Sequence, residues 1–600
     1  MDLETLLPAI QSLHDLPRLV SALGHQPLWD EVLAETGMDS WPSTVAVVGR
    51  TGDLPWFGIE SHVPEQDAEK LARGLSRRGR VCLVLALDTM TRRLAVVAGL
   101  NSCPALALDL VRPSAVGLAS LARLVATSDG GALAFAARAA EVLTSETVGR
   151  RFFREFRDAL EKLSAGLPGP MQVEDRHSLA LLQLTRILFL YFIQTKGWLA
   201  GRERFLAEEV DRCLRRGRRI HRDLLRPLFF GTLNRPAAGR SRAAAAFGPV
   251  PFLNGGLFEP HALERRFRAD ISNDLWRQTF DRLFERFHFT VTEGERHGGI
   301  APDMLGRMFE GVMAPDARHA SGTFYTPSRL VGSVLDAAMT ALLASRLRCG
   351  DSEAEQRFKD PDPHAAKILC SLTLLDPAVG SGAFLLGALD RLSAFGRGAN
   401  PSARKRRVLQ QNLFGVDQSA AAVRLTELRL WLAVISEDPA EDAQQVNPLP
   451  NLDCLIRQGD SLFDPIDQSF RLSSQRPNIL ADLSELRRAL IAATGAGKRA
   501  LVRRLRTVEG HALAESLRFA EAGIDADVAE CLRQARGHDL FGLRHGLDRE
   551  LRQRLAELRS RRRVLRTERR RLARHGEVPW FHYQSHFADV FANGGFDLVM

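Results

Sequence analysis

The sequence lacks paired cysteines, long apolar runs and an appreciable number of lysines. Its seven cysteines are scattered and none forms a Cys-x-x-Cys pair, which argues against a disulfide framework or a zinc site and indicates a reducing, cytoplasmic compartment. The longest strongly apolar run, from Ile187 to Ile193, has seven residues, whereas a membrane span needs about 20. The start, MDLETLLPAI, has no basic and no long apolar segment, so it is no secretory signal. We therefore expect no membrane partner and no metal site.

Basic residues outnumber acidic ones by 81 to 72, which gives a net charge of +9, and only seven of the basic residues are lysine. A basic chain is typical of proteins that bind nucleic acid. The excess of arginine over lysine is equally well explained by a GC-rich coding sequence. The charge alone leaves both explanations open.

Six hundred residues are too many for a single hydrophobic core, so several domains are expected. Residues 1–135 predict a small α/β domain, because five short strand-like segments occur between residues 43 and 111, with a charged helical segment among them. This layout would suit a nuclease core, but no Asp is followed by a Glu-x-Lys that would hold a catalytic metal. The closest text, Asp67 to Lys70, lies on the predicted helix, so a scaffold or accessory role is favoured.

Residues 136–300 predict a helical domain. The segment from Ser178 to Leu199 has the apolar density of a core helix. The segment VPFLNGGLF, from Val250 to Phe258, predicts a Gly-Gly turn between apolar anchors.

Residues 301–600 alternate between apolar segments that end in an acidic residue and helical segments. Strand followed by helix, repeated, predicts a parallel, doubly wound α/β sheet. Asp376, Asp417 and Asp460 end the first three predicted strands at intervals of 41 and 43 residues, and the next strand-end aspartate, Asp597, follows 137 residues later. The long interval predicts an Arg-rich helical insertion over about residues 475–575.

Leucines recur every seven residues near the end of this insertion, at Leu551, Leu558, Leu565 and Leu572. The pattern predicts a narrow apolar stripe that packs against one partner helix. The arginine-covered face of the same helix suits either phosphate contact or simple solvation, and the pattern does not separate the two.

The segment DPAVGSGAFLLGAL predicts a ligand-binding turn. Asp376 sits at the carboxyl end of a strand, where open α/β sheets bind ligands, and Gly380 and Gly382 let the backbone turn tightly and approach a ligand. The dinucleotide fingerprint fails because the next glycine, Gly387, is two positions too late, which disfavours a nicotinamide-dependent oxidoreductase. TGAGKRA, from Thr494 to Ala500, is no phosphate loop. A cationic sulfonium ligand suits this acidic cleft better.

The two following strand ends suit the rest of a nucleoside cofactor. The carboxylate of Asp417 can accept both hydroxyls of a ribose. Asp460 can accept a hydrogen bond from an adenine amino group. One acidic strand end means little because Asp is common in caps and turns, but three in register indicate a cofactor site.

Five segments occur in a characteristic order: SGTFYTPSRLV, LLDPAVGSGAFLL, LFGVDQSAAAVRLTELRLWL, LPNLDCLIRQGDSLF and GGFDLV. LFLYFIQTKGWL, FLNGGLF, DMLGRMFEGVM and PWFHYQSHFADVF accompany them. Together they resemble the Eco57I-like adenine-N6 DNA methyltransferases of type IIG-like restriction-modification systems. The resemblance covers roughly residues 180–600.

The resemblance implies a Rossmann-like class I methyltransferase sheet over residues 301–600 and S-adenosylmethionine as the methyl donor. It implies that Tyr325, Thr326 and Pro327 contact the methionine end of the cofactor. Asp376, Gly380 and Gly382 would form the cofactor loop, Asp417 would hold the ribose and Asp460 the adenine. The sequence departs from the family at Val379, where a Cys or similarly small residue is usual, and the neighbouring glycines should make this tolerable.

In this family the strand FDLV is followed at once by a glycine and then by the catalytic tetrapeptide Asn-Pro-Pro-Tyr/Trp. The acceptors of this tetrapeptide activate the adenine amino group while its aromatic ring stacks on the flipped base. None of those four residues is present, so no catalytic residue is assigned and they are expected just beyond Met600. The sequence is therefore interpreted as an N-terminal fragment with an incomplete sheet. The expected function is site-specific adenine-N6 methylation of double-stranded DNA, with a restriction subunit or a fused nuclease as a further partner. The alternative is a non-catalytic scaffold that retains the fold.

Overall fold

A computed structural model describes residues 3–32, 45–100, 103–111, 113, 115–126, 131–167, 170–254, 256–267, 270–290, 300, 302, 304–306, 326, 328–395, 400–466, 477–537 and 546–600. The chain forms two compact units. The first combines Met1–Gly166 with Ile271–Leu330, and the second combines Leu167–Asp270 with Val331–Met600. The division into three domains at residues 135 and 300 stays a prediction.

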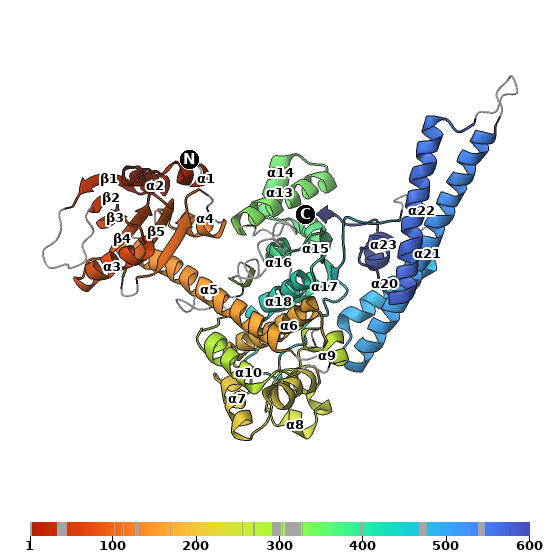
Figure 1. Cartoon of the computed structure of the whole chain (residues 1–600), viewed down its shortest axis with the longest axis horizontal. Coiled ribbons are helices and arrows are strands. Elements are labelled where there is room, and N and C mark those ends of the chain that lie inside the picture. Colours follow the sequence, from red (N-terminus) through yellow and green to blue (C-terminus); the bar gives the residue numbers. More distant parts are fainter. Residues whose placement is uncertain are drawn as a thin grey trace. The chain divides into compact units, whose positions relative to one another are not determined.

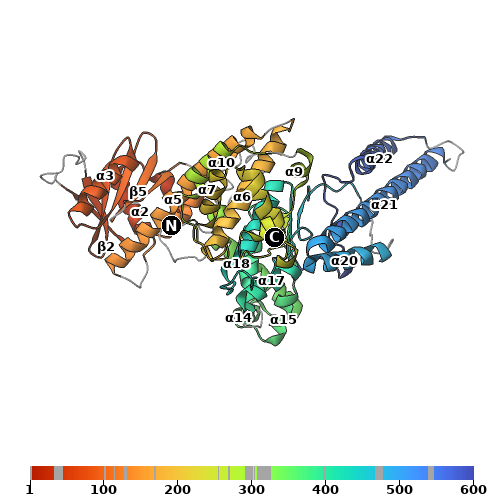
Figure 2. The ribbon, with the colours of Figure 1, turned by 90° about the horizontal axis from the view of Figure 1, so that it is seen from below.

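The first unit is built on a six-stranded mixed sheet whose strands lie side by side in chain order. Its strands are β1 (Gln26–Glu31), β2 (Val45–Thr51), β3 (Leu54–Glu60), β4 (Cys82–Asp88), β5 (Arg93–Gly99) and β6 (Ala105–Asp109). Only β3 and β4 pair in parallel, because helix α3 (Pro64–Arg77) carries the chain back between them. Figure 2 shows this sheet at the red end of the chain.

Both faces of this sheet are covered by helices. The alternating side chains of β4 show this: Leu83 and Leu85 join a core with the N-terminal helices and α5, whereas Cys82 and Val84 join a core with α3. The other helices of this unit are α1 (Leu3–Leu6), η1 (Leu7–Ala9), η2 (Leu13–Asp15), α2 (Leu16–Ala22), α4 (Ala115–Ala122), α5 (Ala132–Gly166), α10 (Asn273–Thr279) and η7 (Phe280–Phe284). The five strands predicted between residues 43 and 111 are confirmed. Strand β1 was missed because its residues are exposed or half-buried and give no alternating pattern.

The second unit contains a four-stranded, all-parallel sheet. Its strands are β7 (Leu374–Asp376), β8 (Leu413–Asp417), β9 (Ile456–Gln458) and β10 (Leu598–Val599), in the order β10-β7-β8-β9. The chain steps from β7 to β8 to β9 in one direction, and β10 then pairs with the other edge of β7. The predicted parallel pairing is confirmed. The order of strands reverses between β7 and β10, and ligands bind at such a switch point in open α/β sheets.

Helices connect and surround these strands. The connecting helices are α16 (Ala383–Phe395), α17 (Pro401–Gln411) and α18 (Ala420–Ser436). The other helices, in chain order, are α6 (Val173–Thr195), α7 (Phe205–Arg215), η3 (Ile220–Leu225), η4 (Pro227–Leu233), η5 (Ala237–Gly239), α8 (Arg242–Ala245), η6 (Gly256–Phe258), α9 (Ala262–Phe267), α13 (Ser328–Leu347), α14 (Asp351–Lys359), α15 (Pro363–Ser371), α23 (Tyr583–His586) and α24 (Ala588–Ala592).

Two helices in the described part of the chain are long and apolar enough to cross a membrane by length and composition, namely α6 and the segment Leu330–Leu347 of α13. Within the fold, 89% of the apolar window of α6 is buried, against 22% for Leu330–Leu347. Helix α6 is therefore the core helix that its sequence predicts.

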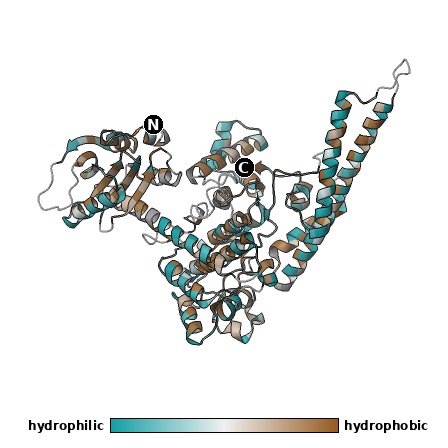
Figure 3. Ribbon diagram, in the orientation of Figure 1, coloured by the Kyte–Doolittle hydropathy of each residue, from teal (hydrophilic) through white to brown (hydrophobic). Residues whose placement is uncertain are grey.

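The insertion between β9 and β10 is helical, as its sequence predicts. It contains α20 (Pro477–Ala492), α21 (Gly495–Arg536) and α22 (Arg549–His575), and α22 packs along α21 (Figure 1). Leu558, Leu565 and Leu572 are buried and Leu551 is half-buried, so the leucine stripe faces α21. Many of the other residues of both helices are hydrophilic (Figure 3).

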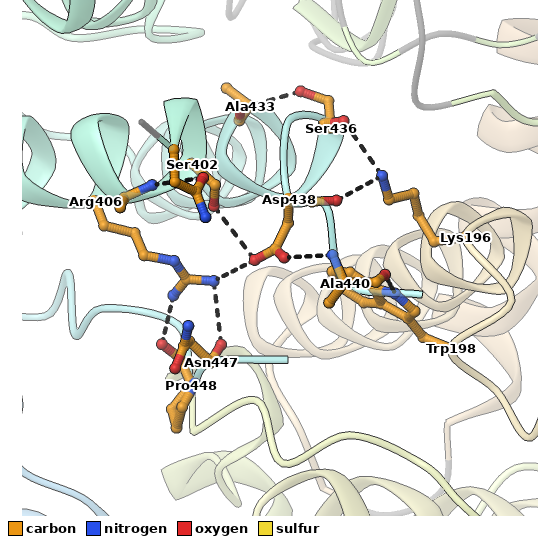
Figure 4. A network of polar contacts seen from close by, with 12 residues as sticks. Lys196, Trp198, Ser402, Arg406, Ala433, Ser436, Asp438, Ala440, Asn447 and Pro448 are labelled. Carbon is orange, nitrogen blue, oxygen red and sulfur yellow. Dashed lines mark hydrogen bonds and ion pairs between the residues drawn. The ribbon is translucent and has the colours of Figure 1, made fainter. Parts of the chain in front are cut away.

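The segment QTKGWL joins α6 to the end of α18 (Figure 4). The Lys196 ammonium donates to the carbonyl of Asp438 at 3.0 Å, and the Trp198 indole donates to the carbonyl of Ala440 at 2.8 Å. The Asp438 carboxylate is paired in turn with Arg406 at 3.1 Å. This motif therefore has a structural role, because it fixes the helical layer to the parallel sheet.

The segments FLNGGLF and LPNLDCL meet at the end of α20. The side-chain amides of Asn254 and Asn451 both donate to the carbonyl of Ala493, at 3.0 and 2.8 Å. Lys498, which is fully buried, pairs with Glu259 at 3.0 Å and with Asp453 at 2.8 Å. These contacts anchor the base of the α21–α22 hairpin, and they also show that the lysine of TGAGKRA is committed to internal ion pairs.

Candidate functional site

The turn between β7 and α16 has the tight backbone that its glycines predict. Gly380 has φ +52° and Gly382 has φ +79°, a region that side-chain-bearing residues rarely adopt. A Cβ at Gly382 would lie 2.9 Å from the Cγ2 of Thr426, so this position has no room for a side chain. The glycines therefore serve both the turn and the close packing of the turn on α18.

Asp417, the last residue of β8, fixes this turn from the neighbouring strand. One carboxylate oxygen accepts the Gly380 amide at 2.8 Å and the other accepts the Ser419 amide at 2.8 Å. A carboxylate has about four acceptor positions, so two further hydrogen bonds, such as those from a diol, remain available on this half-buried side chain.

Two residues of α18 hold the carbonyls of the same turn, and sequence reasoning did not identify them. The Thr426 hydroxyl donates to the Gly380 carbonyl at 3.1 Å, and the Arg429 guanidinium donates to the Ser381 carbonyl at 2.5 Å. The available signal was the polar residues of the largely apolar stretch VRLTELRLWLAV, among which Thr426 and Arg429 lie three positions apart and therefore on one face of the helix.

Asp376 is almost fully buried at the end of β7. Burial raises the pKa of its carboxyl to about 7; the Ala378 amide, which donates at 3.1 Å, lowers it, and the nearby charge of Asp417 raises it further. A carboxyl whose pKa is near neutrality and which lies at the carboxyl end of a parallel strand is a candidate functional group. Its proton is easily displaced by an incoming positive charge.

Asp460 lies two residues beyond the end of β9, so the prediction that it ends the strand is wrong by two residues. The amide of the preceding Gly459 donates to the Asp417 carbonyl at 2.9 Å, which places Asp460 next to the β8 end. Its carboxylate accepts the amides of Leu462 at 3.0 Å and of Phe463 at 3.2 Å, as in a turn. The strand ends early because Asp460 forms an isolated parallel bridge with Trp580 instead.

The predicted methionine-end segment is only partly visible. Tyr325 and Pro327 lie outside the described residues, and Thr326 is described as partly exposed. The structure brings together Asp376, Gly380, Gly382 and Asp417 in one turn system. The cofactor roles of all eight predicted residues stay predictions.

Asp597 does not occupy a strand end, which corrects the expectation drawn from its spacing. It immediately precedes β10, and its carboxylate accepts the Thr373 amide at 2.8 Å and the Thr373 hydroxyl at 3.0 Å. Arg346 also pairs with it. Since Thr373 immediately precedes β7, Asp597 lies at the amino edge of the sheet and serves to align β10 with β7.

Known proteins that resemble this chain include one curated relative and several distantly similar solved structures. No family profile matches the chain. A putative type II restriction enzyme and methyltransferase of Methanocaldococcus jannaschii is 26% identical over 340 residues. The match covers 50% of this chain and 28% of that relative, so the chain spans little more than a quarter of the relative's length. Over this stretch the chain is similar in sequence to that putative restriction enzyme and methyltransferase.

The solved structures are less similar. The type IIL restriction-modification enzyme MmeI in complex with DNA has a TM-score of 0.35 and 17% identity, over 61% of this chain and 48% of that one. The DrdV–DNA complex has a TM-score of 0.25 and 15% identity, over 75% of this chain and 37% of that one. Scores of this size do not establish a shared fold.

The described part of the chain holds no group of three or more His, Cys, Asp or Glu side chains that could bind a metal ion. The functional groups that it does bring together are the buried carboxyl of Asp376, the half-buried carboxylate of Asp417 and a turn with free space above Gly380. At Gly380 an added Cβ would meet only the Ala378 carbonyl, at 3.8 Å. This arrangement suits a ligand that carries a diol and a positive charge.

Proposed function

We propose that the chain is a site-specific DNA methyltransferase of a restriction-modification system, that it binds S-adenosylmethionine in the β7–α16 turn, and that its target is the N6 atom of adenine in double-stranded DNA. The observation that carries the proposal is the glycine turn between β7 and α16, whose Gly380 amide donates a hydrogen bond to the Asp417 carboxylate at 2.8 Å. The motif resemblance and the homologue support the same reaction. The adenine target rests on the resemblance alone, because the sequence of 600 residues contains no Asn-Pro-Pro-aromatic segment.

The residues present fit such a cofactor. The Asp417 carboxylate has acceptor positions left for the two ribose hydroxyls. Asp460 is held close to Asp417, because the amide of the preceding Gly459 donates to the Asp417 carbonyl. The buried Asp376 carboxyl would face a positive ligand as an anion, since a nearby cation lowers the pKa of a carboxyl. When bound, the cofactor supplies an electrophilic methyl group on sulfur. Gly380 and Gly382 keep the turn narrow enough for the backbone to lie against it.

Asp417→Ala is expected to weaken S-adenosylmethionine binding by about 1.5–3 kcal/mol, the usual effect of removing a charged hydrogen-bond partner. Isothermal titration calorimetry of the 600-residue protein measures this directly. Part of the loss will come from the turn itself, because the substitution also frees the Gly380 and Ser419 amides.

Asp442→Ala is the matched control. Asp442 is an exposed aspartate that accepts the amide two residues later, from Gln444 at 3.0 Å, much as Asp417 accepts that of Ser419. Its removal should leave the affinity unchanged. Unchanged affinity in Asp417→Ala as well would exclude Asp417 from the ribose role.

A further inference from the structure

A cavity of about 1440 Å³ lies at the base of the α21–α22 hairpin. Its walls come from α21, the end of α22, the end of β9 and the segment from Gly256 to Arg265. None of the eight residues predicted to bind the cofactor lines it. The cavity is therefore separate from the glycine turn, although Gln418 and Gly459 place one wall at the carboxyl ends of β8 and β9.

The inner wall of this cavity carries arginines that are neutralised within the fold. Arg424 pairs with Glu427 at 2.8 Å, and Arg457 pairs with Glu509 at 2.9 Å. Both acids are buried. The first pair lies within α18, whereas the second joins β9 to α21 and holds the strand against the hairpin.

The outer wall carries arginines of a different kind, which we call the outer arginines: Arg499, Arg503, Arg506, Arg570, Arg571 and Arg574. All six are exposed. Within the described ranges, no carboxylate oxygen lies within 4.0 Å of any of their guanidinium groups. The first three share one face of α21, because they are spaced by four and then three residues.

Some arginines that come earlier in α22 do form ion pairs, so the lack of carboxylate partners does not extend along the whole hairpin. Arg562 pairs with Asp525 at 2.7 Å, and Arg566 and Arg569 both pair with Glu521, at 2.5 and 2.7 Å.

Four acids that line the cavity, Glu259, Glu427, Asp453 and Glu509, form their ion pairs with Lys498, Arg424 and Arg457 and not with the outer arginines. Among the outer arginines, Arg506 is near enough to Asp453 for its charge to help lower the pKa of that carboxyl. Clustered positive charges repel one another unless an anion is bound.

We propose that the outer arginines bind the phosphate backbone of double-stranded DNA, a proposal that rests on the proposed function for the choice of DNA as partner. The planar guanidinium fork pairs with two phosphate oxygens at once, and such contacts position a protein on a duplex without reading its sequence. Their place beside the ends of β8 and β9 would hold the duplex near the edge of the sheet at which the cofactor turn lies.

The test compares two triple variants of the 600-residue protein. Arg499→Gln, Arg503→Gln and Arg574→Gln together remove three outer arginines. The control replaces Arg554, Arg559 and Arg563 by Gln; these are exposed residues of α22 that do not line the cavity. Both variants lose the same net charge from the same hairpin, so a difference between them reports position and not charge alone.

Affinity for a mixed-sequence 30-bp duplex is measured by fluorescence anisotropy between about 50 and 200 mM salt. Removing three phosphate contacts should reduce the slope of log K against log salt by about 2–3 and lower the affinity at 50 mM salt on the order of 10- to 100-fold. The control should change the slope by less than about 0.5. Equal effects of the two variants, or no salt-dependent duplex binding by the unmodified protein, would overturn the proposal.

Two further measurements distinguish duplex binding by the outer arginines from a nucleotide site in the cavity and from failure of the proposed function. A mononucleotide presents the same phosphate chemistry, so ATP binding is measured alongside; if the triple variant loses ATP binding while duplex binding is unchanged, the cavity is a nucleotide site and the proposal is wrong. S-adenosylmethionine affinity is expected to be the same in both triple variants and the unmodified protein. Absence of cofactor binding in all three would count against the proposed function, whereas loss of duplex binding only in the outer-arginine variant would support the inference.

Discussion

Arg186→Met is expected to lower the free energy of unfolding of the second unit by about 3–5 kcal/mol, the usual result of removing one partner of a buried ion pair. Arg186 is fully buried on α6 and pairs with Glu264 at 2.7 Å. It also donates to the carbonyls of Leu257 at 2.6 Å and Glu259 at 2.7 Å. Methionine fills a similar volume but would leave one carboxylate and two carbonyls without these partners.

The protonation behaviour of Glu264 supports this expectation. Burial raises the pKa of its carboxyl, but the charge and hydrogen bonds of Arg186 outweigh that effect and hold the pKa below its ordinary value. Without Arg186 the effect of burial on the Glu264 pKa would be opposed only by the hydrogen bonds from the His261 amide and the Gln183 side chain. Glu264 would then take up a proton at a higher pH or draw water into the core, and both changes favour the unfolded chain.

Hydrogen–deuterium exchange of peptides from α6 measures the effect, because an opening energy lower by 3–5 kcal/mol corresponds to an increase in exchange rate on the order of 100- to 1000-fold or more. Arg215→Met on α7 is the matched control: it is an exposed arginine and should change stability by no more than about 0.5 kcal/mol. Similar protection in both variants would show that the pair does not hold the FLNGGLF segment to α6.

The parallel sheet could be anticipated because each strand carries its own local signal. An apolar run, an acidic end and a helix follow one another at β7 and β8, and the structure places Asp376 and Asp417 at the last residue of those strands. The prediction failed at Asp597, which was assigned to the end of a strand from its spacing behind Asp460 and not from an apolar run that precedes it. An aspartate beside an apolar run can cap either end of a strand, and only the contact with Thr373 decides which.

The site was anticipated less completely than the sheet. Glycines at a strand-to-helix turn are visible in any sequence, whereas the residues that hold the turn, Thr426 and Arg429, lie more than 40 positions away and contact only its backbone. The outer arginines were visible only as a charged face. Whether such a face is paired depends on which acids oppose it across the hairpin, and that is a property of the packing of α21 on α22.

Stability is expected to depend on pH through Asp376, and Asp376→Asn should remove this dependence. The folded pKa of about 7 lies above the unfolded value, so the folded chain binds more protons between pH 4 and 7 and its stability falls as pH rises through that interval. Because the pKa is about 7 in the folded chain against an ordinary value of 3.8, about 4 kcal/mol of stability is lost by pH 8. Asn resembles the protonated acid in shape and cannot ionise. The variant should therefore match the unmodified protein near pH 4 and be more stable at pH 8, as measured by urea unfolding.

The same substitution should have the opposite effect on cofactor binding. At pH 8 the Asp376 carboxylate is ionised and would attract a sulfonium ligand, so Asp376→Asn should weaken S-adenosylmethionine binding on the order of 10- to 100-fold, as for loss of a buried charged partner. The affinity of the unmodified protein should increase as pH rises from 6 to 8, with about one proton released per ligand at the lower pH, whereas the variant should bind equally at both.

Sinefungin, which carries an ammonium group in place of the sulfonium, should follow the same pattern, and S-adenosylhomocysteine, which is neutral at that position, should not. A pH-independent affinity for all three ligands would place Asp376 outside the site and leave its raised pKa as a purely structural cost of burial.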